Sequence, residues 1–262
     1  MIFKPMNNDI EYYGIDILKE CIISQKIYYR VNTAKQNVFD KYVSSLEGAA
    51  KLKLFDYSVD KKKESFGYLI LEKQISSLLK KTELIKFYDK NHKIIYFADE
   101  INEKFLCYPP VLGIKYNSKV IEAIGVYTNP PIEPKNYIEN YMFIRNNFPY
   151  VIQNFNYSVL FNEILDDMVF NKECYLFLFG FDITEQGAKK YKFYIKLEKE
   201  TCIKKIYELL KDKYAFDSEF LLECFYTIPK DNNCFVDIVA FSFLDSKICL
   251  NIYYKQKIRV II

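Results

Sequence analysis

The sequence contains no tryptophan, one histidine, three arginines and seven glycines. The single histidine, His92, cannot supply the ligands of a multi-histidine metal site or form a well-supported catalytic dyad. No Gly-rich phosphate loop is present, which argues against nucleotide hydrolysis. The net charge is only +3, so nucleic-acid binding would need a concentrated basic patch that the composition does not indicate.

Long apolar runs are absent as well. The sequence has no run of 18 apolar residues, and the start MIFKPMNNDIEYY lacks the basic beginning and apolar core of a signal peptide. The seven cysteines are scattered and never spaced C-x-x-C, which is typical of reduced thiols. Cys224 is expected to be a buried, inert thiol. We therefore expect a cytoplasmic protein without a membrane span.

What the chain does have is apolar and aromatic content. Half of its residues are hydrophobic, with 24 Tyr and 22 Phe, enough for a large core in 262 residues. No linker rich in Pro, Gly or Ser divides the chain, so residues 1–262 are expected to form a single domain.

Helical periodicity and strand periodicity alternate along the chain. The pattern predicts helices over 11–26, 33–44, 73–90, 99–108, 136–147, 157–170, 199–214 and 218–228. Hairpins are predicted to begin near residues 46, 109, 174 and 236, each after a pair of helices. The turns of the last three fall at Asn117-Ser118, Glu185-Gly187 and Asp245-Ser246.

The regular order helix, helix, strand, strand predicts an α+β fold of repeated ααββ units. Consecutive hairpins can join into one antiparallel sheet with all helices on one face, and the sheet can close into a barrel ringed by helices. Four hairpins are visible in the pattern. For a fifth hairpin the sequence offers only two weak candidates, HKIIYFA at 92–98 and LLECFYTI at 221–228.

Two strands carry different chemistry on their two faces. The apolar faces are Tyr191, Phe193, Ile195, Leu197 and, in the last strand, Leu250, Ile252, Tyr254. The opposite faces carry Lys192, Tyr194, Lys196 and Asn251, Tyr253, Lys255. We expect the apolar faces to meet the helices and the lysine-tyrosine faces to line the barrel interior, although the solvated outer face of a sheet would have the same pattern.

At this point the chain resembles the ABBA prenyltransferases, and among them it is most similar to the cyanobactin-type peptide prenyltransferases. Three stretches carry the likeness: VFDKYVSSLEGAAKLKLFDYSVDKKK, FLFGFDITEQGAKKYKFYIKL and ICLNIYYK. The repeat order covers nearly the whole chain. The resemblance implies a barrel whose interior binds an isoprenoid diphosphate.

The resemblance also implies roles for individual residues. Lys192, Lys196 and Lys255 would hold the diphosphate, and Tyr194, Tyr253 and Asn251 would flank the allyl cation. Glu47 falls on the position of the family's general base. The donor would be dimethylallyl or geranyl diphosphate, and the acceptor a peptide side chain or a small aromatic compound. No cofactor is expected to be tightly bound and no metal site in the protein is implied, although Mg²⁺ could accompany the donor. Oligomerisation is left open.

Departures from the family pattern keep alternatives open. Phe66 stands where the family commonly has a diphosphate-binding Arg, and the strand VIEAIGVYT has no basic residue, its nearest cations being Lys115 and Lys119. A catalytically inactive barrel that binds a ligand is therefore the main alternative, and a single-strand nucleic-acid binder a remote one. Glu47 could instead be a solvated residue at a helix-strand junction.

Overall fold

Five β-hairpins follow one another in the computed structural model. The structure describes residues 10–18, 21–30, 55–56, 64–69, 74–80, 84–105, 108–117, 120–129, 137–151, 161–162, 165–214, 216–244 and 247–257. Within them, the strands are β1 (Ile10–Leu18), β2 (Cys21–Arg30), β3 (Phe55–Asp56), β4 (Glu64–Leu69), β5 (Tyr108–Asn117), β6 (Val120–Asn129), β7 (Cys174–Thr184), β8 (Gly187–Leu197), β9 (Cys234–Leu244) and β10 (Lys247–Gln256). Each strand is antiparallel to its neighbours, and pairing of β1 with β10 closes the sheet into a barrel.

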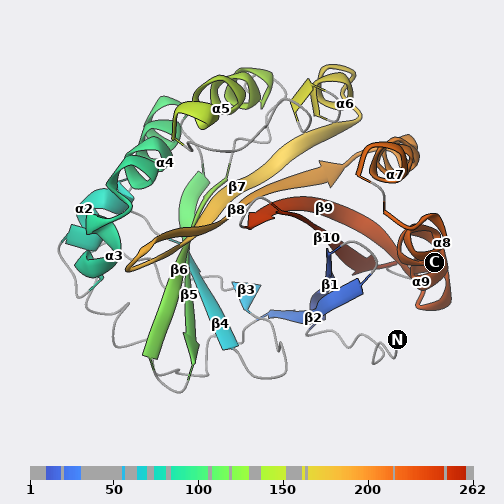
Figure 1. The fold of residues 1–262 in the computed structure, drawn as a ribbon, viewed down its shortest axis with the longest axis horizontal. Helices are drawn as coiled ribbons and strands as arrows, with labels where there is room; N and C mark the ends of the chain where they lie inside the picture. Colours follow the sequence, from blue (N-terminus) through green and yellow to red (C-terminus); the bar gives the residue numbers. More distant parts are fainter. Residues whose placement is uncertain are drawn as a thin grey trace, which may run out of the picture.

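The described helices lie on the outer face of this barrel along strands β5 to β9 (Figure 1). They are α2 (Ile75–Lys80), α3 (Ile85–Asp89), α4 (His92–Lys104), α5 (Tyr137–Val151), α6 (Asp166–Phe170), α7 (Glu200–Tyr214), α8 (Ser218–Leu222), the π-helical turn η2 (Glu223–Thr227) and α9 (Ile228–Asp231). None of the helices described is long and apolar enough to cross a membrane. The predicted fold class is confirmed: from β4 onward the described helices alternate with hairpins, and they pack on the outside of an antiparallel barrel.

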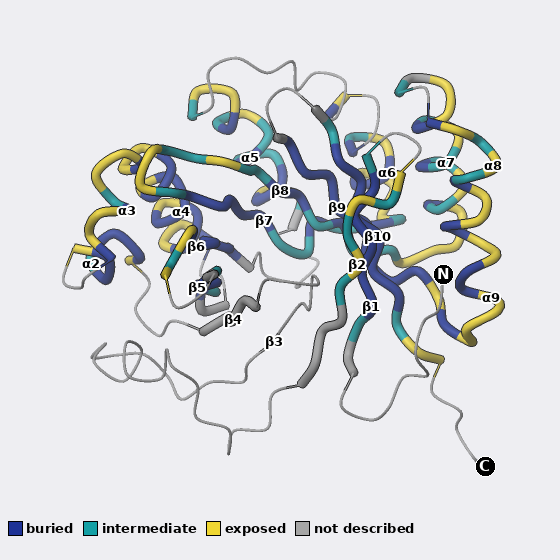
Figure 2. The backbone as a smooth tube through the Cα atoms, turned by 60° about the horizontal axis from the view of Figure 1, so that its bottom comes forward, coloured by how far each residue is buried: buried dark blue, intermediate teal, exposed yellow. Residues whose placement is uncertain are grey.

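The hydrophobic core lies between the helices and the outer face of the strands. In α7 the fully buried Cys202, Ile206 and Leu210 recur every fourth residue, so one helical face meets the sheet. Exposed residues lie on the helices while the strands are mostly buried (Figure 2). At the centre of the core, the ring of Phe148 on α5 packs edge-on against Phe179 of β7 and Phe193 of β8, at 5.3 and 4.9 Å between centroids.

The first hairpin corrects the predicted helix over 11–26. Residues in this range form β1 and β2, and Tyr13, Ile15 and Ile17 are buried on alternate positions. β1 pairs with β10, from Tyr13 opposite Tyr254 to Ile17 opposite Leu250. The alternation is short enough to satisfy a helical period as well, and the partner strand that decides it lies some 240 residues away.

The number of hairpins is corrected with it, from four to five. The missing hairpin is the one at the start of the chain, and the two stretches considered for it are helical: 92–98 lies in α4 and 221–228 spans the end of α8, η2 and the start of α9. The predicted helix over 33–44 lies outside the described residues.

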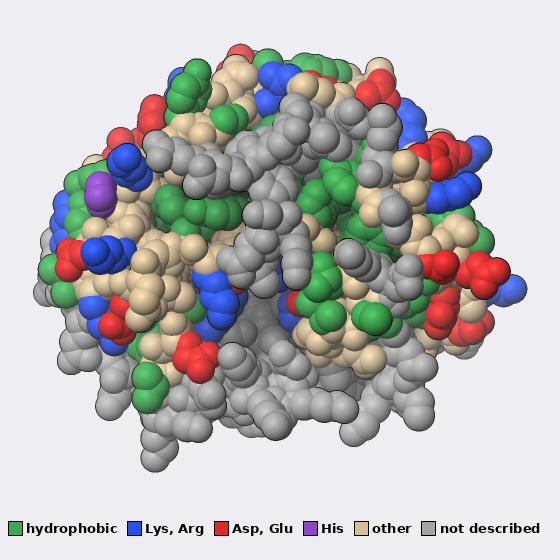
Figure 3. Space-filling model, viewed as in Figure 1, with side chains coloured by type: hydrophobic (Ala, Val, Ile, Leu, Met, Phe, Trp, Pro, Cys, Tyr) green, Lys and Arg blue, Asp and Glu red, His purple; other side chains and the backbone are tan. Residues whose placement is uncertain are grey.

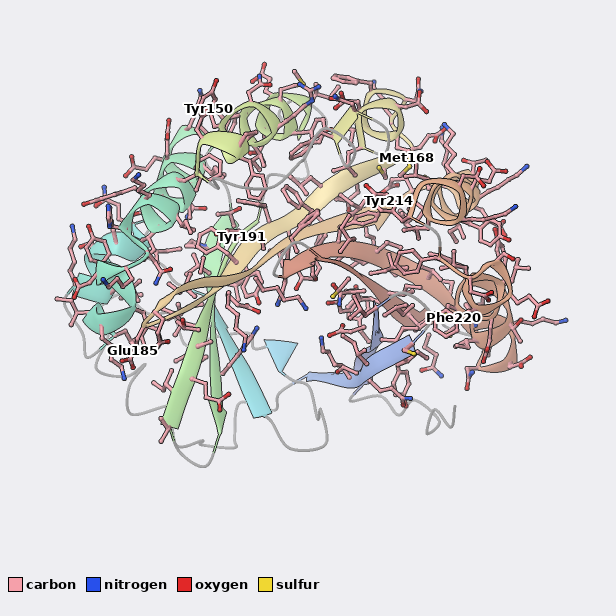
Figure 4. The ribbon with its side chains drawn as sticks, viewed as in Figure 1. Tyr150, Met168, Glu185, Tyr191, Tyr214 and Phe220 are labelled. Carbon is pink, nitrogen blue, oxygen red and sulfur yellow. The ribbon has the colours of Figure 1, made fainter. Side chains whose placement is uncertain are left out.

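One end of the central hairpin is fastened to the helices. Glu185, at the turn of β7 and β8, forms an ion pair with Lys86 of α3, and Asn91 donates a hydrogen bond to the carbonyl of Thr184 (2.8 Å). Figure 4 shows Glu185 at this tip beside α3. The hairpin that carries most of the polar inner face is thus anchored at its tip.

Candidate functional site

Charged side chains line the inner face of the barrel. On β8, Phe193 and Ile195 are fully buried against the helices, so Lys192, Tyr194 and Lys196 face the opposite way, into the lumen. Tyr191, labelled in Figure 4, belongs to the outer set and packs on Phe148. On β10, Leu250, Ile252 and Tyr254 face the helices. The prediction of which face of β8 and of β10 meets the helices is therefore confirmed. A ring of ten strands is wider than an eight-stranded barrel, whose interior is filled by side chains or holds one small ligand.

The first polar group inside the barrel, the Asp182 cluster, consists of Lys115, Tyr127, Asp182 and Lys192. The Asp182 carboxylate accepts hydrogen bonds from the Tyr127 hydroxyl (2.9 Å) and from the ammonium groups of Lys192 (2.9 Å) and Lys115. Lys192 also donates to the Tyr127 hydroxyl at 3.1 Å, and its ammonium lies 5.5 Å from the centroid of that ring. Four neighbouring strands, β5 to β8, therefore contribute one side chain each.

Three glycines fix the position of the Tyr127 ring. Gly113, Gly125 and Gly180 lie on β5, β6 and β7, and a methyl group added at any of them would touch this ring. At Gly125 it would lie 2.7 Å from the phenolic oxygen and 2.8 Å from Cζ. The ring therefore lies flat on a wall that has no side chains of its own, and its hydroxyl reaches Asp182.

The electrostatics of the Asp182 cluster are those of two ammonium groups sharing one carboxylate. Burial alone would lower the pKa of Lys192, but Asp182, Tyr127 and Tyr194 together raise it well above the ordinary value. Lys115 differs: burial, with Lys192 and Lys26 nearby, lowers its pKa to about 7 despite the attraction of Asp182. Burial would raise the pKa of Asp182, yet Lys115 and Lys192 hold it far below the usual range.

The second group, the Asp16 cluster, consists of Asp16, Lys26, Lys190, Ser242 and Asn251. The Asp16 carboxylate accepts hydrogen bonds from the ammonium of Lys26 and from the side-chain amide nitrogen of Asn251. The Ser242 hydroxyl donates to the side-chain oxygen Oδ1 of Asn251. Lys190 has no direct hydrogen bond or ion pair within the described part of the chain. Burial and the neighbouring charge of Lys192 lower its pKa to about 8. Its direct cross-strand neighbour is Asp182, so the two clusters adjoin.

The third group, the Asp237 cluster, consists of Tyr12, Lys196, Asp237 and Lys255. Asp237 accepts hydrogen bonds from Lys196 and from the Tyr12 hydroxyl (2.9 Å), and the Lys255 ammonium lies 5.5 Å from the centre of the Tyr12 ring. On β8, Lys192 thus turns to Asp182 on β7, whereas Lys196 turns to Asp237 on β9. The three lysines predicted to bind one diphosphate belong to two groups on opposite sides of β8.

A row of aromatic side chains connects these groups. The Tyr194 ring lies 6.2 Å from that of Tyr127 and 5.7 Å from that of Tyr253. Tyr253 packs with Ile238 and Ala240 in a small hydrophobic cluster separate from the main core, joined by Tyr12, Phe177 and Tyr194. In the space-filling view the molecule is hollowed near its centre, and basic side chains lie on both sides of the hollow (Figure 3).

With this geometry in hand, the chain can be compared with known proteins. No protein-family profile and no curated protein matches it. Solved structures do match. One is AnaPT from Neosartorya fischeri, which has 8% identity and a TM-score of 0.61; the match spans 94% of this chain and 77% of the AnaPT chain. The fold is that of the ABBA-type prenyltransferases.

Two further ABBA-type structures extend this comparison. NotF prenyltransferase has 9% identity and a TM-score of 0.57, covering 95% of this chain and 80% of its own. The 6-dimethylallyltryptophan synthase from Micromonospora olivasterospora, solved in complex with DMASPP and Trp, has 8% identity and a TM-score of 0.54, covering 95% of this chain and 82% of its own. At such identities the likeness is one of fold, and the cyanobactin-type subfamily stays a prediction.

Some predicted site residues cannot be placed. Glu47 and Lys119 lie outside the described residues, and the side chain of Phe66, on β4, lies outside them too. Asn251, predicted to flank the cation, is buried in the Asp16 cluster. Asp16 and Lys26 were not predicted as site residues, because the helical period predicted a helix for their segment.

Tyr127, Asp182 and Lys190 were not predicted either. Lys190 could have been predicted, because it shares the inward face of β8 with Lys192 and Lys196. Asp182 and Tyr127 could not, because only the pairing of β6 with β7 brings them together.

Several residues with ionisable side chains lie outside the barrel interior. His92 is exposed at the start of α4. Burial raises the pKa of the Cys224 thiol to about 12, which agrees with the expected inert cysteine. Asp166 and Asp167 on α6 are bound by Arg145 and Lys205. In the described part of the chain, no group of three His, Cys, Asp or Glu side chains could hold a metal ion.

Proposed function

We propose that this protein is a prenyltransferase that binds an allylic diphosphate inside its barrel and transfers the prenyl group to an aromatic or peptide acceptor. One observation carries the proposal: among the described residues, the ammonium groups of Lys26, Lys115, Lys190 and Lys192 are directed into two adjoining clusters whose carboxylates are Asp16 and Asp182. Positive charge gathered on the inner face of a barrel favours an anion that carries several charges.

The aromatic row supplies the second requirement of this chemistry. The allylic C–O bond breaks, the diphosphate leaves with the electron pair, and a carbon or oxygen of the acceptor forms the new bond. Tyr194, with Tyr127 and Tyr253 on either side, would shield the intermediate cation from water and stabilise it with ring faces. Glu47 remains our proposed acceptor of the proton released.

The lysines would neutralise the leaving group in place of a metal held by the protein. Asp16, Asp182 and Asp237 are each bound by a lysine, so these carboxylates are poor candidates for Mg²⁺ ligands. Mg²⁺ could still arrive with the donor. We expect donor binding to persist in EDTA.

The proposal is tested by calorimetry with dimethylallyl and geranyl thiodiphosphate, which resist ionisation. Lys192→Ala should weaken binding by at least about tenfold, because it removes an ammonium from the centre of the anion site. Lys189→Ala is the matched control, since Lys189 neighbours the site in sequence but is exposed. Absence of saturable binding by the folded wild type would refute the proposal.

Transfer is tested next, with small indoles and phenols and with Tyr- or Trp-containing peptides, by mass spectrometry. A mass increase of one prenyl unit on an acceptor is the expected result. Tight donor binding without turnover on any of them would favour the inactive ligand-binding barrel instead.

A further inference from the structure

The environment of Asp182 resembles a phosphate site filled by the protein itself. Its Oδ1 accepts the hydrogen bond from Tyr127, and its Oδ2 is bound by Lys115 and Lys192. A phosphate oxygen accepts charge-assisted hydrogen bonds from the same kinds of group as a carboxylate oxygen does. Three donors from three different strands therefore already converge on one anion.

We propose that, in the ligand-free protein, Asp182 occupies the position of one phosphate group of the prenyl diphosphate. The incoming phosphate displaces the Asp182 carboxylate from Lys115, Lys192 and Tyr127. This inference rests on the proposed function, because it requires an anion to bind in the lumen. Asp182 is then a positioning residue: it keeps two ammonium groups and a hydroxyl assembled before the ligand arrives.

Access from the lumen makes the exchange feasible. The side chain of Lys115 is 32% exposed, whereas that of Asp182 is 7% exposed, so solvent reaches part of the Lys115 side chain although its ammonium is paired with Asp182. The displaced carboxylate also has another cation within reach. Lys190 lies directly opposite Asp182 on β8 and has no direct partner among the described residues.

The ligand-free arrangement is held in place by the ring beneath it. Tyr127 cannot follow the carboxylate, because its ring lies against the wall of Gly113, Gly125 and Gly180 and its hydroxyl still accepts the hydrogen bond from Lys192. Its hydroxyl therefore stays available to whichever anion occupies the position. Displacement changes one side chain, Asp182, and leaves its three partners where they are.

The test measures the affinity for inorganic diphosphate by calorimetry, at low salt and about pH 6.5, for the wild type, Asp182→Asn and Asp237→Asn. Asp237 is the matched control because it is also a buried lumen carboxylate bound by a lysine and a tyrosine. Asp182→Asn should bind diphosphate at least about tenfold more tightly than wild type, since nothing negatively charged competes for the donors. Asp237→Asn should change the affinity less than about threefold.

Thermal denaturation gives an independent readout. Asp182→Asn should melt at a lower temperature than wild type without ligand, and saturating diphosphate should raise its melting temperature by more than it raises that of wild type. A scaffold role alone would lower stability without increasing the response to the ligand.

A charge-balanced pair keeps the test decisive if Asp182→Asn does not fold. Lys115→Met retains the Asp182–Lys192 pair, and Lys115→Met/Asp182→Asn removes one charge of each sign. The double variant should bind diphosphate more tightly than Lys115→Met.

Unchanged or weaker binding on removal of Asp182 would overturn the inference, and so would equal tightening in Asp237→Asn. If the wild type itself fails to bind diphosphate, the proposed function fails along with it.

Discussion

Replacement of Gly125 by alanine tests whether the glycine wall positions Tyr127. The new Cβ would lie 2.7 and 2.8 Å from the Tyr127 phenolic oxygen and Cζ, so the ring must leave its place. Overpacking of this kind costs about 1–3 kcal/mol, and a lost hydrogen bond to a charged group about 1.5–3 kcal/mol. The lower backbone entropy of alanine in the unfolded chain offsets about 0.5–1 kcal/mol.

We therefore expect Gly125→Ala to lower the free energy of unfolding by roughly 3 kcal/mol. For a domain of this size that is a fall in melting temperature of about 6–12 °C. The assay is urea denaturation followed by circular dichroism, with thermal melts as a check. Gly113→Ala is the milder companion, because its nearest contact with the ring would be 3.3 Å, and it should cost less than about 1 kcal/mol.

A double-mutant cycle separates the ring from other causes. The three atoms nearest to an added Cβ at Gly125 all belong to Tyr127, so Gly125→Ala should be nearly neutral in a Tyr127→Ala background. Gly180→Ala should stay costly there, because its Cβ would also lie 2.6 Å from the carbonyl oxygen of Val126. If Gly125→Ala costs the same in both backgrounds, the reasoning is refuted.

Three further predictions concern the site. Because the pKa of Lys115 is lowered to about 7 and that of Lys190 to about 8, both lysines lose their charge as the pH rises from roughly 6 to 9, and diphosphate affinity should decline over this range. Calorimetry at pH 8 in buffers of different ionisation enthalpy should detect proton uptake, and a pH-independent affinity would contradict this prediction. Tyr194→Phe should keep prenyl transfer, while Tyr194→Ala should raise the ratio of prenyl alcohol to transfer product, as measured by chromatography; an unchanged ratio would remove Tyr194 from its shielding role. Lys196→Met should weaken diphosphate binding less than about threefold, since Lys196 is bound to Asp237; a loss as large as that of Lys192→Met would place both lysines on one ligand.

The sequence by itself determined the repeating unit and the faces of its best strands. Alternation in 191–197 and 250–255 predicted which side chains face the helices, because a strand of period two cannot place neighbouring residues on the same side. The same alternation predicted that Phe193 and Ile195 lie on the opposite face of the strand from the lysines. The antiparallel barrel ringed by helices followed from the order of these units.

The tertiary structure decided which residues meet. The segment around Tyr13 and Ile17 satisfies a helical period, and only β10, at the other end of the chain, makes it a strand. The same pairing closes the barrel and brings Asp16 to Asn251. No local pattern could group Lys192 with Asp182 and Lys196 with Asp237, because each partner comes from a different neighbouring strand and the register between strands is set by long-range pairing.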